Sequence, residues 1–364
     1  MNKFFALAFV FGSLAAAQAQ FTVGDLVVLR DGTGSAALSS AGTALFLDEY
    51  ATTGGSLLYS VAIPTSGSTA LVNSGSAASE GALNLSANGQ ELVFAGYNTN
   101  AGFASIANSP SATVARGVGT VDASGNYTLA ATTSSSFSAN NIRSGTSDGN
   151  GNYWAAGANS GVVYLGSGTP AAVSTTSANN RVLQDIGGNL YFSSGSGTHG
   201  IYSISGAPTT TGNTANNIVN TGSASSPYDF AFNSAGNLLY IADSDAFTNS
   251  TTIGGVEKWQ FNGTAWVFQY SLSLGTNGAV GLAVDFSGAN PVIYATSASG
   301  QSLFDIVDTG SSSTGTLLDS AGANEAFRGL DFAPTPAPEP GTLALIGCGV
   351  TAIITFRRLK KFRA

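Results

Sequence analysis

Charged residues and cysteine are both scarce in this chain. Asp, Glu, Lys and Arg make up only 9% of the 364 residues, which argues against a helical bundle with a Lys/Glu-rich surface and against an acidic disordered chain. The single cysteine, Cys348, leaves no partner for a disulfide within the chain, so stability has to come from packing. Gly, Ser, Thr and Asn take the place of the missing charges, which is typical of β-structure with many turns.

The few charges are unevenly distributed. All twenty acidic residues lie at or before Glu339, whereas five of the twelve basic residues follow residue 356. The segment 20–340 therefore carries six basic and twenty acidic side chains. Because nucleic acids and anionic lipid surfaces bind basic proteins, this acidic segment argues against both as partners.

The N-terminus has the three parts of a secretory signal peptide. Lys3 supplies a positive charge, residues 4–17 form an apolar run, and Ala17 and Ala19 are the small residues of a signal-peptidase site. We expect signal peptidase to remove residues 1–19, so that the exported protein begins at Gln20.

The C-terminus also has three parts. The first part is a proline-rich linker, residues 334–340, which can form neither the interior of a helix nor a central strand. The second is a run of sixteen uncharged residues, 341–356, whose length is near the lower limit for a transmembrane helix. A basic tail, residues 357–364, follows this helix and by the positive-inside rule stays in the cytoplasm. Its basic residues are Arg357, Arg358, Lys360, Lys361 and Arg363.

The order of Pro338-Glu339-Pro340, a short apolar helix and a terminal Arg/Lys cluster resembles the PEP-CTERM sorting signal. This resemblance covers residues 336–364 and implies recognition by an exosortase, a membrane cysteine protease that cuts near the Pro-Glu-Pro motif. It implies transient anchoring in the inner membrane of a Gram-negative-type bacterium, followed by release to the cell surface or extracellular matrix. A permanent C-terminal tail anchor is the alternative, because the positive-inside pattern fits both.

Residues 20–333 predict an all-β body. We find no run of ten or more residues with an apolar period of 3.6, but many runs of four to eight residues rich in Val, Ile, Leu, Phe and Tyr. A unit of alternating strand, Gly/Asn turn and second strand recurs along the body. Its clearest copies are 82–97, 229–243 and 282–296, with weaker copies at 141–156 and 181–194.

These repeats predict a β-propeller. Two further strands follow most copies, and four strands at a period of roughly 40 to 60 residues are typical of propeller blades. The last strand, 328–333, lacks a successor, so we expect it to close the ring by pairing with N-terminal strands at 43–50, 56–63 and 69–72. We predict six blades, or seven if residues 21–30 belong to a separate sheet. A β-helix or a sandwich of the autotransporter or adhesin type is the alternative fold.

The sequence contains few candidates for chemistry. HExxH and P-loop motifs are both absent. We interpret the single histidine, His199, as a turn residue, because zinc sites draw three or four ligands.

Asp243 and Asp245 follow a strand end and are candidate calcium ligands, with an Asx turn as the alternative. Calcium is the only cofactor that the sequence leaves open. Residues 146–154 resemble the Asp-box turn of sialidase propellers but lack its glycine two residues after Asp148, so we predict a blade turn with Trp154 in the core.

Three further aspartates, Asp229, Asp285 and Asp331, each precede a phenylalanine in the first strand of a repeat. In a closed ring they would meet at the central channel and hold a metal. The alternative is that they cap turns or inner strands.

Two functions follow from these patterns. The first is a non-catalytic scaffold for adhesion that binds extracellular polysaccharide or protein, and the second is a secreted hydrolase or lactonase with a metal in the channel. The lack of a catalytic constellation favours the first. Four aromatic residues would stack on sugars if they shared one face, and would otherwise fill the core: Tyr97, Trp259, Trp266 and Tyr270.

Overall fold

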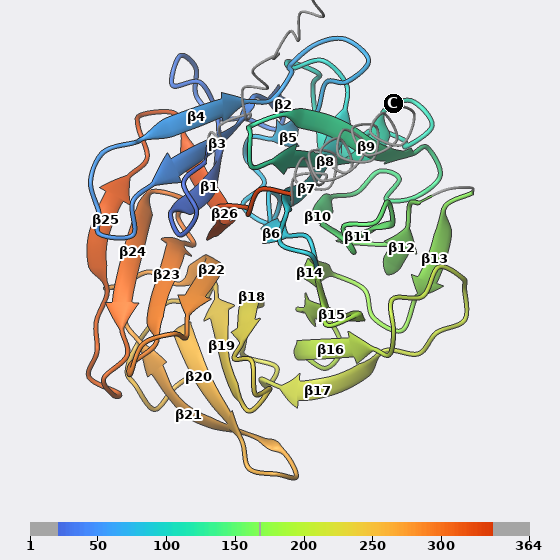
Figure 1. Cartoon of the computed structure of the whole chain (residues 1–364). Helices are drawn as coiled ribbons and strands as arrows, with labels where there is room; N and C mark the ends of the chain where they lie inside the picture. Colours follow the sequence, from blue (N-terminus) through green and yellow to red (C-terminus); the bar gives the residue numbers. More distant parts are fainter. Residues whose placement is uncertain (1–20, 167–168, 338–364) are drawn as a thin grey trace, which may run out of the picture.

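Six four-stranded antiparallel sheets form a ring around a central axis (Figure 1). The structure is a computed structural model, and it describes residues 21–166 and 169–337. Apart from strands, turns and loops, these residues form one single-turn 3-10 helix, η1 (Ile106–Asn108). The protein is therefore a six-bladed β-propeller. This architecture confirms the predicted fold class and the count of six, and it excludes the β-helix and the sandwich.

The first strand of each sheet lies next to the axis (Figure 1). Blade 1 comprises β26 (Ala326–Phe332), β1 (Leu26–Asp31), β3 (Leu45–Tyr50) and β4 (Tyr59–Ala62). Blade 2 comprises β6 (Leu83–Leu85), β7 (Glu91–Asn98), β8 (Ala115–Asp122) and β9 (Tyr127–Thr133). Blade 3 comprises β10 (Ile142–Ser147), β11 (Tyr153–Gly157), β12 (Val162–Tyr164) and β13 (Ala171–Ser174).

The other three blades follow in chain order. Blade 4 comprises β14 (Asn180–Ile186), β15 (Asn189–Ser194), β16 (Gly200–Ile204) and β17 (Asn216–Asn220). Blade 5 comprises β18 (Pro227–Phe232), β19 (Leu238–Asp243), β20 (Gly255–Phe261) and β21 (Trp266–Leu272). Blade 6 comprises β22 (Ala279–Asp285), β23 (Val292–Ser297), β24 (Ser302–Val307) and β25 (Thr316–Ser320). A small separate sheet pairs β2 (Gly42–Thr43) with β5 (Asn73–Ser74).

Blade 1 closes the ring with strands from both ends of the described chain. Strand β26 pairs antiparallel with β1, from Asp31 opposite Ala326 to Leu26 opposite Phe332. The predicted closure by the C-terminal strand is confirmed. Its direct partner, however, is β1, which overlaps the segment 21–30. The alternative of seven blades, with residues 21–30 in a separate sheet, is therefore wrong. Residues 69–72 were wrongly placed in this blade, because Val72 instead forms an isolated bridge with Tyr97.

The core of the molecule lies between successive blades. Val182 and Ile201 of blade 4, for example, pack in one cluster with Phe230, Ile241 and Trp259 of blade 5. Each sheet thus buries both faces, which is why several strands are long apolar runs and not simple alternations. Strand β1 illustrates this, since its run of Leu26, Val27, Val28 and Leu29 is buried throughout.

Neighbouring inner strands run in the same direction. Ala82 N–H donates to Arg143 O, and further along both strands Ala87 N–H donates to Ser147 O. The propeller therefore has a start face, where the inner strands begin, and an end face, where they end. Thr335 N–H donates to Gly89 O in the β6–β7 turn, so the described chain leaves the body on the end face.

The predicted signal peptide, the Pro-Glu-Pro motif, the apolar helix and the basic tail lie outside the described residues. Within residues 21–166 and 169–337, no helix has the length and apolar character needed to cross a bilayer.

Candidate functional site

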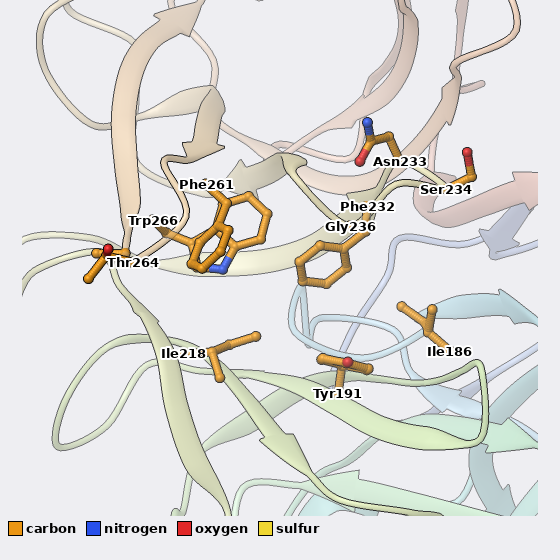
Figure 2. Close-up of a pocket in the computed structure, with 11 residues that line it drawn as sticks. Ile186, Tyr191, Ile218, Phe232, Asn233, Ser234, Gly236, Phe261, Thr264 and Trp266 are labelled. Carbon is orange, nitrogen blue, oxygen red and sulfur yellow. The ribbon is translucent and has the colours of Figure 1, made fainter.

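The end face carries a pocket between blades 4 and 5 with a volume of about 560 Å³. Most of its wall comes from residues at the ends of strands and in the turns that follow them. The lining residues are Ile186, Tyr191, Ile218, Phe232, Asn233, Ser234, Gly236, Phe261, Thr264, Ala265 and Trp266 (Figure 2). None of these side chains carries a charge, so the pocket is aromatic and neutral.

Four aromatic rings follow one another along the pocket (Figure 2). The ring centroids of Tyr191 and Phe232 are 5.4 Å apart, and those of Phe232 and Trp266 are 5.6 Å apart. Phe261 lies beside Trp266, also at 5.6 Å. All four side chains are partly exposed. They therefore offer ring surface to a ligand while they support one another.

Two short turns hold these rings in place. In the β20–β21 turn, Asn262 Oδ1 accepts hydrogen bonds from the backbone N–H groups of Thr264 and Ala265, at 3.0 and 2.9 Å. Gly263 has a φ of +94°, which favours glycine. This turn places Phe261 directly opposite Trp266 across the strand pair. Rigid turns of this kind reduce the ordering cost of binding.

The β18–β19 turn repeats this device. Asn233 Oδ1 accepts from the N–H groups of Asn237 and Leu238, both at 3.0 Å, and so fixes the turn that follows Phe232. Ser234 and Gly236 in the same turn line the pocket. The site thus combines fixed apolar rings with amide and hydroxyl groups at its rim, which suits a ligand with both apolar faces and hydroxyl groups.

A second cavity, of about 260 Å³, lies at the mouth of the channel on the same face. Ile186 lines both cavities, so they adjoin. Polar side chains of the inner strands line the second one, among them Asn84, Gln184, Asp185 and Asp331. A long ligand in the aromatic pocket would therefore reach hydrogen-bonding groups at the axis.

Two of the predicted channel aspartates, Asp229, which is buried, and Asp331, which is half-buried, are hydrogen-bonded to neighbouring inner strands. Asp229 Oδ2 accepts from Leu282 N–H of blade 6 at 3.0 Å. Asp331 Oδ2 accepts from Leu85 N–H of blade 2 at 2.7 Å. Burial raises the pKa of Asp229 well above its usual value and raises that of Asp331 to about 6. Both side chains thus join adjacent blades.

Asp285 does not join this pair. It ends β22 opposite Val292, and its Oδ1 accepts from Ser287 N–H at 2.8 Å within the following turn. Hydrogen bonds from Ser287 lower the pKa of the Asp285 carboxyl. Asp229, in contrast, lies in the irregular start of β18. The repeat alignment therefore equated positions with different registers, and the three carboxylates do not form one ring.

The candidate calcium ligands and the histidine lie near the start face. Asp243 is buried, and its Oδ2 accepts from Ser225 Oγ and Ser226 N–H at 2.6 and 2.8 Å. Asp245 is exposed and donates its N–H to Asp243 Oδ1. His199 Nδ1 lies 2.6 Å from the carbonyl oxygen of Ser225. In the described part of the chain, no three His, Cys, Asp or Glu side chains are grouped as a metal site would require.

The segment that resembles an Asp box forms the β10–β11 turn. Asp148 Oδ1 accepts from the N–H groups of Asn150 and Asn152, at 2.8 and 3.1 Å. Trp154 is 1% exposed and donates its indole N–H to Pro208 O. The prediction of a blade turn with a core tryptophan is confirmed.

Of the four aromatic candidates, only Trp266 lines the pocket. Trp259 is 6% exposed in the core, and Tyr97 is fully buried with its hydroxyl bonded to Glu80. Tyr270 bonds to Asp308 on blade 6. The sequence analysis did not identify Tyr191, Phe232 and Phe261 as pocket residues. Phe232 and Phe261 flank Asn/Gly turns, and an aromatic residue in that position was the signal that could have identified them.

Comparisons with known protein families and with curated proteins find no match. Solved propeller structures are similar only at low identity. A putative 6-phosphogluconolactonase from Bacteroides fragilis is 13% identical, with 82% of each chain covered and a TM-score of 0.46. A GH74 enzyme from Niastella koreensis is 15% identical with a TM-score of 0.48, and the match covers 82% of this chain but 46% of the enzyme. These similarities do not bear on what the chain binds.

Proposed function

We propose that this protein is an exported cell-envelope or extracellular-matrix protein, sorted and released by an exosortase, whose non-catalytic propeller binds polysaccharide. The aromatic pocket between blades 4 and 5 carries the binding part of the proposal. Its volume, about 560 Å³, falls within the usual range of ligand sites, and its rings suit the apolar faces of sugars. The adjoining cavity at the channel mouth supplies amide and carboxyl groups for hydroxyls.

The charges favour a neutral polysaccharide. The segment 20–340 has six basic and twenty acidic side chains, and no basic residue lines either end-face cavity. A uronate-rich or sulfated chain would meet net repulsion on approach. Polymers of neutral hexoses avoid this cost and still offer faces for stacking.

The sorting part of the proposal rests on the order of the Pro-Glu-Pro motif, the apolar segment and the basic tail. The fold is consistent with it, since Thr335 is hydrogen-bonded to Gly89 and the linker starts at the surface of the body. A protease at the membrane would therefore meet the motif outside the folded domain.

Trp266→Ala tests the binding part. Trp266 contacts both Phe232 and Phe261, so its removal opens the middle of the aromatic row. We expect at least about a tenfold loss of affinity for a neutral polysaccharide, the cost usual for a central aromatic contact. Affinity electrophoresis of the full-length protein in gels that contain neutral or anionic polysaccharides measures this loss.

Phe103→Ala is the matched control, because Phe103 is 38% exposed on the loop between β7 and β8 and does not line the pocket. It should migrate like the wild type in every gel. Equal retardation of the Trp266→Ala and wild-type proteins would place the binding surface elsewhere, and retardation only by anionic polymers would contradict the neutral class.

A further inference from the structure

Five of the six inner strands have an irregular register near the start face, in β10, β14, β18, β22 and β26. Such bulges redirect side chains, and they are frequent next to binding sites. Each irregularity contains one or two inner-strand residues, and we call the first of these in each strand the bulge ring: Arg143, Arg181, Tyr228, Val280 and Arg328.

The bulge ring concentrates positive charge in an acidic body. It holds three of the six basic residues of the segment 20–340. Arg328 is neutralised by Asp31, whose Oδ2 lies 2.7 Å from the Arg328 Nε. Across residues 21–166 and 169–337, Arg143 and Arg181 form no ion pair with a carboxylate. Two cations without an ion-pair partner therefore lie at one end of the channel, and Glu80 and Asp245 act on them only from a longer distance.

Both of these arginines have unused hydrogen-bond donors. Arg181 stacks on Tyr228, with its guanidinium carbon 4.1 Å from the ring centroid, and its buried Nε has no acceptor. Arg143 is only 9% exposed, and its Nε also lacks an acceptor within the described structure. Burial lowers the pKa of Arg143, and the nearby charge of Arg181 lowers it further. A buried arginine beside a second, half-buried arginine, both with free donors, is costly unless an anion accompanies them.

A cavity of about 10 Å³ lies inside the bulge ring, lined by Arg181, Tyr228, Val280 and Arg328. This volume holds about one water-sized occupant. Glu80 lines it too, but both of its oxygens are occupied, Oε1 by Tyr97 Oη at 2.6 Å and Oε2 by Ser74 N–H at 2.8 Å.

We propose that this cavity binds one small monovalent anion of the size of chloride, held by Arg181 and Arg328 and supported by the charge of Arg143. The anion would neutralise Arg143 and Arg181 of blades 3 and 4, accept a hydrogen bond from Arg328 of blade 1, and so stabilise the ring at the start face. This site is independent of the aromatic pocket, which lies on the opposite face.

Thermal unfolding of the full-length protein in mild detergent tests the proposal. Sodium chloride and sodium gluconate are compared at equal ionic strength, since gluconate is too large for the cavity. We expect chloride to raise Tm by about 2 °C more than gluconate does. In ³⁵Cl NMR, the wild-type protein should broaden the chloride line, and bromide but not gluconate should reverse this broadening.

Arg181→Met removes the cation that lines the cavity and should abolish both the chloride-specific Tm difference and the line broadening. Arg143→Met should weaken both, and it serves as the second variant if the first fails to fold. Arg30→Met removes the same charge on β1, where Arg30 pairs with Asp48 and Glu325, and should leave the chloride response intact. No chloride-specific broadening by the wild type, or an undiminished effect in Arg181→Met, would overturn the proposal in favour of an internal water.

Discussion

At the scale of single residues, two buried carboxyl groups meet inside blade 5. Asp243 and Glu257 are both fully buried, on β19 and β20. Asp243 accepts hydrogen bonds from three donors, whereas Glu257 accepts only from the indole N–H of Trp259, at 2.7 Å. Burial raises the pKa of Glu257 well above its usual value, and the charge of Asp243 raises it further. Glu257 thus keeps its proton to a higher pH than an exposed glutamate does, with Asp243 as its neighbour.

This pair predicts a loss of stability as pH rises. The folded-state pKa of Glu257 exceeds its unfolded value of about 4.5, so the unfolded chain releases this proton first. The stability contributed by protonated Glu257 is complete below the unfolded pKa and declines as pH rises toward the folded pKa. Glu257→Gln replaces the carboxyl O–H with an amide N–H donor that does not ionise, so it should stabilise the protein at pH 8 by about 1 kcal/mol. Urea unfolding at pH 5 and pH 8 measures the difference.

Asp319→Asn is the matched control, because Asp319 lies partly exposed on the outer strand β25. It should change the free energy of unfolding little at either pH. If Glu257→Gln and Asp319→Asn show the same pH profile, Glu257 is ionised in the folded protein and the pair does not share a proton.

At the scale of secondary-structure elements, β26 determines whether the ring is closed. Its Phe327 and Leu330 are buried in one cluster with Leu26 and Val28 of β1. Arg328 supplies the partner of the buried Asp31. Without β26, blade 1 loses its inner strand, exposes the edge of β1 and leaves a buried carboxylate unpaired.

Truncation at two nearby positions tests this role. A body that ends at Glu325 lacks β26 and should lose cooperative unfolding, or show a Tm lower by about 10 °C or more, since several large side chains and an ion pair are removed. A body that ends at Ala333 keeps β26 and should unfold like one that ends at Ala337. Differential scanning calorimetry of the three bodies distinguishes these cases, and identical Tm values would show that blade 1 is stable without its C-terminal strand.

At the scale of the whole molecule, the aromatic pocket and the exit of the chain share the end face. Thr335 is the last residue with a described hydrogen bond to the body, and the predicted membrane segment begins six residues later at 341. Six extended residues span at most about 20 Å. Under the proposed sorting, a tethered body would therefore stand close to the membrane on the side of its pocket, and cleavage would free that face.

The tail should control where the protein goes. Replacing the basic residues Arg357, Arg358, Lys360, Lys361 and Arg363 with serine should weaken retention in the membrane, because these charges oppose translocation. Glu339→Ala should block processing and leave the protein membrane-bound. Cell fractionation of both variants, in the parent and in an exosortase-deficient strain, reports the outcome. Wild-type protein that keeps its tail in the inner membrane of both strains would indicate a permanent anchor.

The sequence by itself determined that the body is all-β and built from repeated strand units, and it favoured a propeller of six blades. Both depend on local features that repeat along the chain, namely strand-length apolar runs and Asn/Gly turns such as the one at Asn233. Closure by β26 was also predictable, because a strand without a successor needs a partner. The identity of that partner was not, since segments 26–31 and 69–72 look alike as single strands and only the pairing across blade 1 separates them.

Only the tertiary structure decided which residues form sites. The aromatic pocket joins Tyr191 of blade 4 to Phe232 and Trp266 of blade 5, and the distance between such residues depends on how the two sheets pack. Likewise, Asp285 matched Asp229 in the repeat, but Asp285 ends β22 whereas Asp229 lies in the irregular start of β18, and the apolar pattern does not specify how far along a strand a residue is paired. Local periodicity specifies strands, whereas contacts between strands distant in sequence specify sites.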